Sequence, residues 1–406
     1  MSPRSRRASK VALFFVLFTA VLALWIASLR LFYRPSQDAL RPSDGALSSY
    51  ARPLLQRQLN VWADRDARTR ELRRMRASNP EWDLMARTYL VLALANVALR
   101  EARDRDAYVR AMDWLIDDTI AREREHGQGY FLLGYSRARP WINADQRSLF
   151  VDGELALMAA ARRVVRDDRE DLRSQLATRA AQIEAQMSAG PIASAESYPD
   201  ECWTFCNTVA LAALRVREVL DGVDHSAIVQ RWLAQARARL VDGETGLLVS
   251  SYTMDGAVRE GPEGSSIFMV AHDLQVIDRA FAEDQYRRAK RELLREWLGF
   301  GFAREWPASS SRSADVDSGP TIPWVGANAG ASGLAVLGAG SFDDRAALAG
   351  LVASLELAAF PVSEGGSRRF LASNAVGDAV LLYALVEGPL WREVDARRAA
   401  RAGGAR

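Results

Sequence analysis

The chain has 406 residues, of which 49% are hydrophobic and 26% are charged, and its formal net charge is +2 at pH 7. This composition excludes an intrinsically disordered chain and fits one large globular domain or two smaller ones. The basic residues are almost all arginine, since Lys10 and Lys290 are the only lysines, and acids are interspersed among them. Without a long stripe of one charge, we expect no nucleic-acid partner.

The N-terminal segment is typical of a membrane anchor. Four basic residues within the first ten precede an uncharged apolar run, Val11 to Leu29, which is just long enough to span a bilayer. Because basic flanks stay in the cytoplasm, we expect a cytoplasmic tail and transmembrane anchor at residues 1–34 of a single-pass inner-membrane protein. The bulk of the chain would then lie on the periplasmic, extracytoplasmic side. A cleaved signal peptide is the alternative, but Ala23 and Ala27 are poorly spaced for cleavage.

Beyond the anchor, the chain divides into a polar tether and a long helical region. Residues 35–49 are rich in Pro, Ser, Asp and Gly, as in a tether, and residues 396–406 are predicted to be a disordered tail. In between, apolar residues recur at helical spacing. The predicted helices are Trp82–Leu99, Tyr108–Ile120, Ser148–Val165, Leu172–Met187, Thr204–Leu220, Ile228–Leu240, Ile267–Phe281, Tyr286–Leu298, Ala331–Leu337, Ala346–Leu357 and Val376–Leu385. Short segments such as Leu247–Tyr252 are too few for a sheet.

These helices alternate between two kinds. One kind is rich in Ala and Gly, as a helix buried on most sides would be, and the next carries many Arg, Glu and Gln. The pair recurs at roughly 55 to 65 residues, and a fixed repeat of helix pairs indicates a stacked or closed array. We therefore expect an all-α fold, an (α/α)6 toroid of about six hairpins over residues 50–395, with an N-terminal transmembrane helix.

Polar loops rich in Gly and Pro precede the helices predicted to be buried. They are Arg139–Asp145, Ser197–Cys202, Glu260–Ser266, Asp315–Pro320 and Leu371–Asp378. In a toroid these loops meet around the mouth of a central cavity, where acids, aromatic rings and helix N-termini would converge.

The candidate catalytic residues are the acids, the thiol and the imidazole expected near that mouth. They are Glu154, Asp200, Glu201, Cys206, His272, Asp315 and Asp317, with Ser197, Tyr198, Trp203, Tyr252 and Trp324 as substrate-binding candidates. Glu154 is the strongest single acid, because apolar neighbours either raise the pKa of a carboxyl or demand a partner for it. Asp315 and Asp317 could pair as acid and base, or be ordinary turn residues.

Structural roles compete with these assignments. Ser197 and Asp200 have the spacing of a helix capping box, and His272 could be a hydrogen-bonded core histidine. Cys202 and Cys206 could form a disulfide only if the helix began after Cys202, and two buried thiols are the alternative. The histidines lack metal-ligand spacing, so we expect neither a metal nor another cofactor.

Two stretches resemble the linalool dehydratase/isomerase family. They are ESYPDECWTFCNTVALAAL (residues 196–214) and VDGETGLLVSSYTMDGAV (residues 241–258), beside the family patterns E-P-D-N-Y-F-x-Q-C-N-S-x-A and Y-L-S-Y-x-x-x-x-G-A-V. The resemblance implies an exported (α/α)6 barrel that dehydrates or isomerises small terpene alcohols by metal-free acid–base chemistry. It places a functional cysteine at Cys206 and retains Pro199 and Asp200. The other family cysteine falls on Ser197, and the family histidine falls near Glu154.

Three functions remain open from the sequence. The first is a lyase or isomerase acting on a small or lipid-like alcohol, with one carboxyl as acid and a second as base. The second is a glycan-active barrel, such as a glycoside hydrolase or lyase, with two carboxyls flanking a sugar bond. The third is a non-catalytic envelope protein. A closed apolar pocket would favour the first, an open groove the second and a filled cavity the third; a homo-oligomer is possible in each case.

Overall fold

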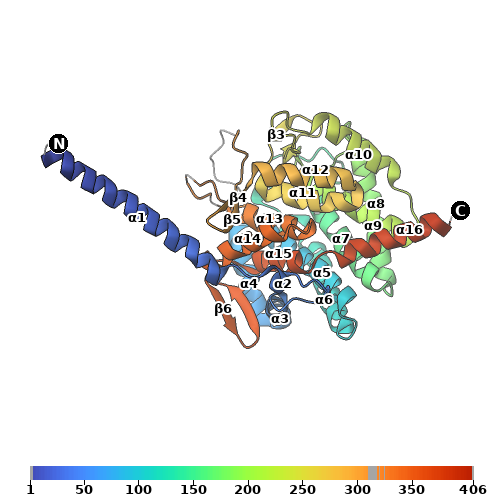
Figure 1. Ribbon diagram of the computed structural model, residues 1–406. Helices are drawn as coiled ribbons and strands as arrows, with labels where there is room; N and C mark the ends of the chain where they lie inside the picture. Colours follow the sequence, from blue (N-terminus) through green and yellow to red (C-terminus); the bar gives the residue numbers. More distant parts are fainter. Residues whose placement is uncertain (1–2, 310–317, 320, 324, 405–406) are drawn as a thin grey trace.

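A closed ring of inner helices forms the body of the computed structural model, which describes residues 3–309, 318–319, 321–323 and 325–404 (Figure 1). The ring consists of α5 (Glu81–Arg100), α7 (Leu149–Val165), α9 (Thr204–Asp221), α11 (Gly264–Ile277), α13 (Ala329–Ser341) and α15 (Ala375–Val386). Each packs against the next, and α15 packs against α5. The predicted (α/α)6 toroid is confirmed.

Outer helices cover this ring. They are α6 (Arg105–His126), α8 (Glu170–Ala189), α10 (Ser226–Arg239), α12 (Arg279–Glu292) and α14 (Arg345–Ala358), with α3 (Ala51–Ala63) and α4 (Arg65–Ser78) covering α15 and α5. The division follows composition, because the Ala- and Gly-rich helices are buried nearly throughout and the Arg- and Glu-rich helices bury one side. Most predicted helices match these, with two exceptions. The predicted 267–281 helix runs past the end of α11 at Ile277, because Asp278 caps a new helix, α12, and the predicted 286–298 helix ends with α12 at Glu292, where a hairpin follows.

The last helix closes one end of the ring. α16 (Pro389–Gly404) lies across the C-terminal ends of the inner helices, where its arginines donate hydrogen bonds to unpaired helix carbonyls. Arg397 bonds to Val164, Arg398 to Val276 and Arg401 to Val219 and Leu220. The disordered tail predicted from residue 396 is therefore wrong as far as residue 404, because these carbonyls order the segment.

The opposite end carries short strands. β1 (Cys202–Trp203), β2 (Ser251–Tyr252) and β3 (Val258–Glu260) form an antiparallel sheet. Two hairpins, β4 (Leu294–Trp297) with β5 (Phe300–Ala303) and β6 (Pro361–Glu364) with β7 (Ser367–Phe370), are separate. Their two-residue turns have positive φ angles at Gly299, Gly365 and Gly366, as tight hairpins require. The expectation that the strands were too few for a sheet is therefore wrong at this rim.

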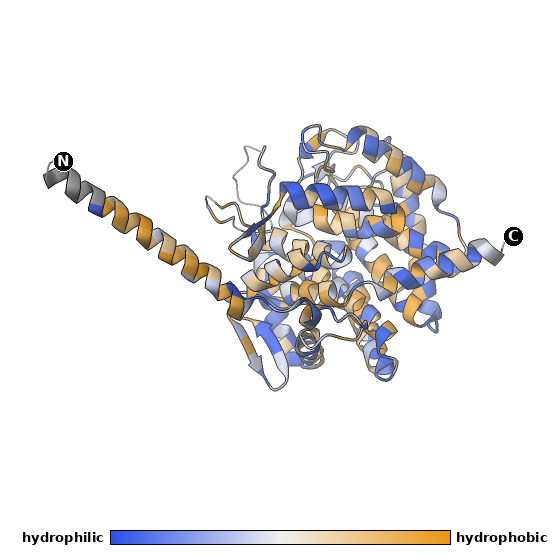
Figure 2. Cartoon of the chain, in the orientation of Figure 1, coloured by the Kyte–Doolittle hydropathy of each residue, from blue (hydrophilic) through white to orange (hydrophobic). Residues whose placement is uncertain are grey.

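The first helix, α1 (Pro3–Tyr33), projects away from the body as a single helix (Figure 1). Its segment Lys10–Tyr33 has 24 residues and a mean hydropathy of 2.5, and none of its apolar stretch is buried against the rest of the chain. Figure 2 shows that this segment is hydrophobic along its length. α5 is also long and apolar, but it is 83% buried and belongs to the core. The predicted tether is not a free linker, because the helix α2 (Gln37–Leu40) buries Leu40 completely and Arg41 bonds to the Gly340 and Glu387 carbonyls.

Ring closure depends on glycine where α13 meets α15. A Cβ on Gly340 would collide with the carbonyl of Ala384, whereas a Cβ on Gly333 of the same helix would lie 3.8 Å from Val380. We expect Gly340→Ala to lower the unfolding free energy by about 1–3 kcal/mol, the usual cost of overpacking. Gly333→Ala should be neutral or stabilise by up to about 1 kcal/mol. Thermal unfolding of the detergent-solubilised chain, followed by circular dichroism, measures both, and equal melting temperatures would contradict this account of closure.

Candidate active site

A small cavity lies where α5, α7, α9 and α11 begin. Its volume is about 220 Å³, below the roughly 300–1,000 Å³ of pockets that hold drug-sized ligands, so it suits a small molecule. Apolar and aromatic side chains form much of its wall: Trp82, Met85, Phe150, Trp203 and Phe205. Acids also line it, namely Glu81, Glu260 and Glu263, together with Ser265, Ser266 and Ser318.

Three polar side chains lie deeper in the ring than this wall. Tyr89 follows Met85 by one turn on α5, Glu154 follows Phe150 by one turn on α7, and Asp273 lies two turns beyond Ser266 on α11. All three are buried, with at most 2% exposed. The charges of Glu154 and Asp273 each raise the pKa of Tyr89, so the three groups face one another. We call Tyr89, Glu154 and Asp273 the polar floor.

Several oxygens of the polar floor lack hydrogen-bond partners, and burial disfavours negative charge on its acids. Within the described residues, Glu154 Oε2, both carboxyl oxygens of Asp273 and the Tyr89 hydroxyl have no hydrogen-bond partner. Burial raises the pKa of Glu154 to about 8, and it raises the pKa of Asp273 well above its ordinary range. Thr208, whose hydroxyl donates to the Phe205 carbonyl, only partly offsets the burial of Asp273. Burial thus favours the acid form of both carboxyls, in which each can donate a proton.

Cys206 lies between the cavity and the polar floor. It lines the cavity, and the charge of Glu154 acts on it. Burial raises the pKa of its thiol well above the ordinary value, although a hydrogen bond with Ser197 lowers it, so Cys206 is a thiol and not a thiolate. The contact joins the two positions that the family resemblance assigned to cysteines.

The two cysteines form no disulfide. Both are free and buried, and the Cys202 Sγ lies 3.2 Å from the Met254 Sδ. α9 does begin after Cys202, at Thr204, as a bridge would require, but Cys202 pairs into the rim sheet and its side chain faces Met254. The alternative of two buried thiols holds.

Other predicted residues form the wall and mouth of the cavity. The Tyr198 hydroxyl donates to Glu81 and accepts the N–H of Leu133 at 3.0 Å. Glu201 accepts hydrogen bonds from the Trp203 indole and from the Tyr135 hydroxyl. Tyr252 is fully buried, and its hydroxyl lies 3.0 Å from the Ser194 hydroxyl. Tyr198 and Trp203 thus lie at the cavity, and Tyr252 lies in the packing around it.

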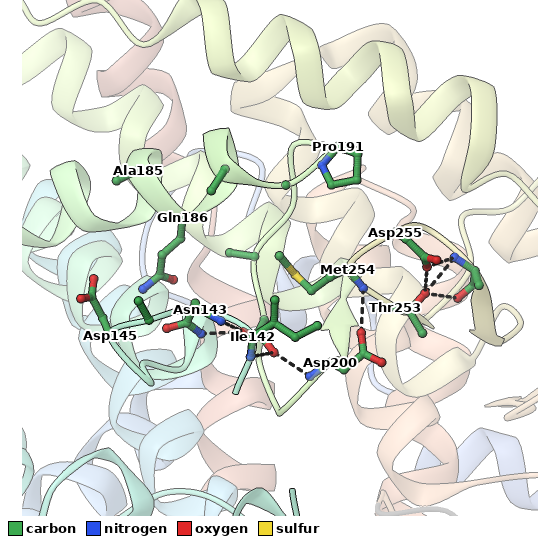
Figure 3. Close-up of a pocket in the computed structure, with 16 residues that line it drawn as sticks. Ile142, Asn143, Asp145, Ala185, Gln186, Pro191, Asp200, Thr253, Met254 and Asp255 are labelled. Carbon is green, nitrogen blue, oxygen red and sulfur yellow. Dashed lines mark hydrogen bonds between the residues drawn. The ribbon is translucent and has the colours of Figure 1, made fainter. Parts of the chain in front are cut away.

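Asp200 faces a different cavity. Figure 3 shows this second cavity, about 640 Å³, in which Asp200 accepts the backbone N–H of Met254 at 3.3 Å. Its other oxygen lies 3.0 Å from Arg259. Asp200 has a φ of 51°, and no side chain caps α9, whose N-cap is Trp203. The capping box is therefore wrong, because residues 198–201 form a tight turn ahead of the helix.

His272 lies toward the closed end of the ring. Its ring nitrogens contact the hydroxyls of Ser341 and Tyr383, both at 2.7 Å, and Nε2 also contacts the Trp391 indole at 3.2 Å. Burial lowers its pKa to about 3, so it is neutral. It fits the alternative of a hydrogen-bonded core histidine. Asp315, Asp317 and Trp324 lie outside the described residues.

Sequence reasoning missed Asp273, Tyr89 and Glu81. Asp273, like Glu154, is an acid within an apolar helix and could have been found by the same criterion, but only the adjacent His272 was predicted as a site residue. Tyr89 gave no signal, since an aromatic residue in an apolar helix is usually packing. Within the described residues, no group of three or more His, Cys, Asp or Glu is arranged to hold a metal ion, and the absence of a cofactor stays a prediction.

The polar floor predicts a pH-dependent stability. Folding raises the pKa of Glu154 from 4.5 to about 8, so the folded state holds a proton that the unfolded state releases. The unfolding free energy should therefore fall as the pH rises through this interval. Glu154→Gln should flatten that fall, whereas Glu125→Gln, on the exposed surface of α6, should leave it unchanged. Urea unfolding at a series of pH values tests this, and an unaltered slope in Glu154→Gln would contradict it.

Known proteins similar to this chain include one solved structure and one sequence family. Among solved structures, the chain is similar to a GH76 α-mannanase from Bacteroides thetaiotaomicron, with 9% identity over 78% of this chain and 87% of that chain and a TM-score of 0.46. Residues 156–375, more than half of the chain, match the sequence model of the family described as linalool dehydratase/isomerase, and the match includes Cys206 and Asp273. The chain therefore belongs to the linalool dehydratase/isomerase family.

Proposed function

We propose that this chain is a lyase or isomerase that removes or relocates the hydroxyl group of a small apolar alcohol by acid–base catalysis. The single observation that carries the proposal is the buried Glu154, whose pKa burial raises to about 8, beneath a small cavity lined by aromatic and apolar side chains together with acids and serines. A buried acid with a pKa near the working pH is what general acid catalysis requires. Membership of the linalool dehydratase/isomerase family supports the same class of reaction.

The proposed reaction uses one carboxyl twice. The apolar wall holds the carbon skeleton, with the hydroxyl directed to the polar floor. Glu154 gives its proton to the hydroxyl oxygen, the C–O bond breaks and water leaves. The Glu154 carboxylate then takes a proton from the neighbouring carbon as the double bond forms, so the residue ends protonated as it began. For isomerisation, water returns to the allylic carbon by the reverse of these steps.

Asp273 and Tyr89 would stabilise the intermediate state. When Glu154 is briefly ionised, its charge lies in a dry interior where nearby donors act strongly. The protonated Asp273 carboxyl and the Tyr89 hydroxyl are donors without another partner among the described residues. Cys206, at the boundary of the cavity, would contact the substrate as a neutral thiol.

The other two functions fit the cavity less well. A glycan-active barrel needs a groove that admits a sugar chain, and a cavity of about 220 Å³ is small for that purpose. Trp82 and Trp203 are half-buried in its wall instead of forming an exposed stacking platform. A purely structural ring would fill the space with side chains.

We further propose that α1 anchors the chain in the inner membrane, with the barrel outside the cytoplasm. The basic residues in the first turns of α1 and the apolar segment that follows them within Lys10–Tyr33 support this placement. The substrate would then be met at the envelope, as a small or lipid-like molecule, and assembly of the chain into a homo-oligomer stays a prediction.

Substitutions test which of the two cavities is the active site. Glu154→Gln, which cannot donate an acidic proton, should lower turnover by about 100-fold or more, and Asp273→Asn should lower it less. Asp200→Asn should retain turnover, because Asp200 faces the second cavity. Purified full-length protein is assayed with a set of tertiary and allylic ten-carbon alcohols, and the products are measured by gas chromatography. Unchanged turnover in Glu154→Gln would exclude the proposed mechanism.

The pH profile gives an independent test. Because the acid form of Glu154 starts the reaction and its pKa is about 8, activity should fall as the pH rises through 8. Replacing Glu154 by Asp should keep some activity while moving this limb, whereas Asp200→Asn should leave the limb in place. A wild-type rate that increases through this interval would contradict the assignment of Glu154 as the acid.

A further inference from the structure

We propose that the barrel rests on the lipid bilayer through an apolar collar and takes its substrate from the membrane. The collar consists of Trp297, Ile322, Val325, Phe360 and Leu371. Their exposed fractions are 67%, 58%, 44%, 66% and 48%. This inference rests on the proposed anchoring by α1 and on the proposed alcohol substrate.

The collar concentrates much of the exposed apolar surface of the body. Outside α1, ten large hydrophobic side chains of the described residues are exposed, and five of them belong to the collar. Large side chains such as Trp297 and Phe360 have no packing role when two-thirds of their surface is in solvent. Exposed apolar groups gathered on one side mark an interaction surface.

The collar surrounds the point where α1 leaves the barrel. The side chain of Arg30, in the last turn of α1, would contact a Cβ at Gly299 from 2.9 Å, and Gly299 lies in the turn that follows Trp297. Arg34 bonds to Glu296 at 2.9 Å and to the Gly299 carbonyl at 3.0 Å. The root of α1 is thus fixed to the β4–β5 hairpin.

The remaining collar residues lie on the same side. Phe360 and Leu371 flank the β6–β7 hairpin and are joined by a backbone hydrogen bond of 3.2 Å. Ile322 and Val325 lie in the segment that pairs with the end of β5 through Arg304 and Ala327. Figure 1 shows β4, β5 and β6 on the side of the body from which α1 leaves, with the C-terminal end of α16 on the opposite side.

The position of the collar beside the end of α1 identifies the lipid bilayer as the surface that the collar contacts. If α1 spans a bilayer, the residues around its root lie at the lipid–water boundary, where tryptophan is favoured. Arg30 has no ion-pair partner among the described residues, so it is available to lipid phosphates at the same level. A lipid surface therefore matches both the apolar side chains and the cation.

The collar also connects the membrane to the cavity. Ile322 and Val325 follow Ser318, which lines the cavity, by four and seven positions in the chain. An apolar alcohol is concentrated in lipid, because transfer of apolar surface out of water is favourable. The substrate class is therefore a membrane-dissolved alcohol that reaches the cavity along this rim.

Depth-dependent fluorescence quenching tests the docking. The full-length chain is reconstituted in vesicles of phosphatidylcholine and phosphatidylglycerol, with and without lipids that carry a nitroxide near the headgroup. Variants with one added cysteine, Trp297→Cys and Phe360→Cys, are labelled with bimane, while the native Cys202 and Cys206 stay unlabelled because they are buried. Val223→Cys, beside α16, is the control distant from the membrane, and Phe14→Cys reports on the anchor.

We expect at least about two-fold quenching at positions 297, 360 and 14 and almost none at position 223. Quenching at position 14 without quenching at 297 and 360 would overturn the docking and leave the anchor intact. Absence of quenching at position 14 would overturn the anchor itself.

A charged collar tests the route to the cavity. The double variant Trp297→Asp with Phe360→Asp should raise KM several-fold for an alcohol supplied in vesicles, because charge weakens contact with the lipid. In detergent its kcat should equal that of the wild type, since neither residue lies at the cavity. An unchanged KM in vesicles would overturn the membrane route, whereas absence of activity in the wild type as well as in the double variant would overturn the proposed function instead.

Discussion

The close approach of the inner helices is the constraint on which the rest of this structure depends. Small residues make it possible: a Cβ on Gly153 would lie 3.3 Å from Ala210, and one on Gly264 would lie 2.7 Å from the Ala331 Cβ. With α15 packed on α5, the ring is complete and every inner helix begins at one rim. The cavity exists because these N-terminal ends meet there, not because any single helix encodes it.

Inside the ring, two neighbouring residues differ sharply in their hydrogen bonding. His272 and Asp273 are adjacent on α11 and both are fully buried. His272 is surrounded by hydroxyl and indole groups that satisfy it, whereas the oxygens of Asp273 have no partner among the described residues. Unsatisfied buried groups reduce stability, so they concentrate where a ligand can complete them. His272 thus has the contacts of a hydrogen-bonded core histidine, whereas for Asp273 only Thr208 partly offsets burial.

The family motif also has a scaffolding part. Glu196 accepts backbone N–H groups from Ile142, Asn143 and Asp200, at 3.0, 2.7 and 2.6 Å, and thereby ties the segment before α9 to the loop before α7. On one side of this segment Tyr198 and Cys206 line the small cavity, and on the other side Asp200 lines the large one. Neighbouring residues of one motif therefore line different cavities, Tyr198 and Cys206 the small one and Glu196 and Asp200 the large one.

Most helices, their alternation and the ring could be predicted from the sequence, because apolar residues recur with helical period and small residues mark the inner positions. It also singled out Glu154 and Cys206, since a charge or thiol within an apolar run stands out. Which polar groups lie close together could be seen only in the folded chain. Tyr89 and Asp273 lie near Glu154, whereas Asp200 lines the second cavity and His272 bonds to Tyr383. Partners for a polar group come from helices distant in the chain, and their positions depend on packing that no local pattern contains.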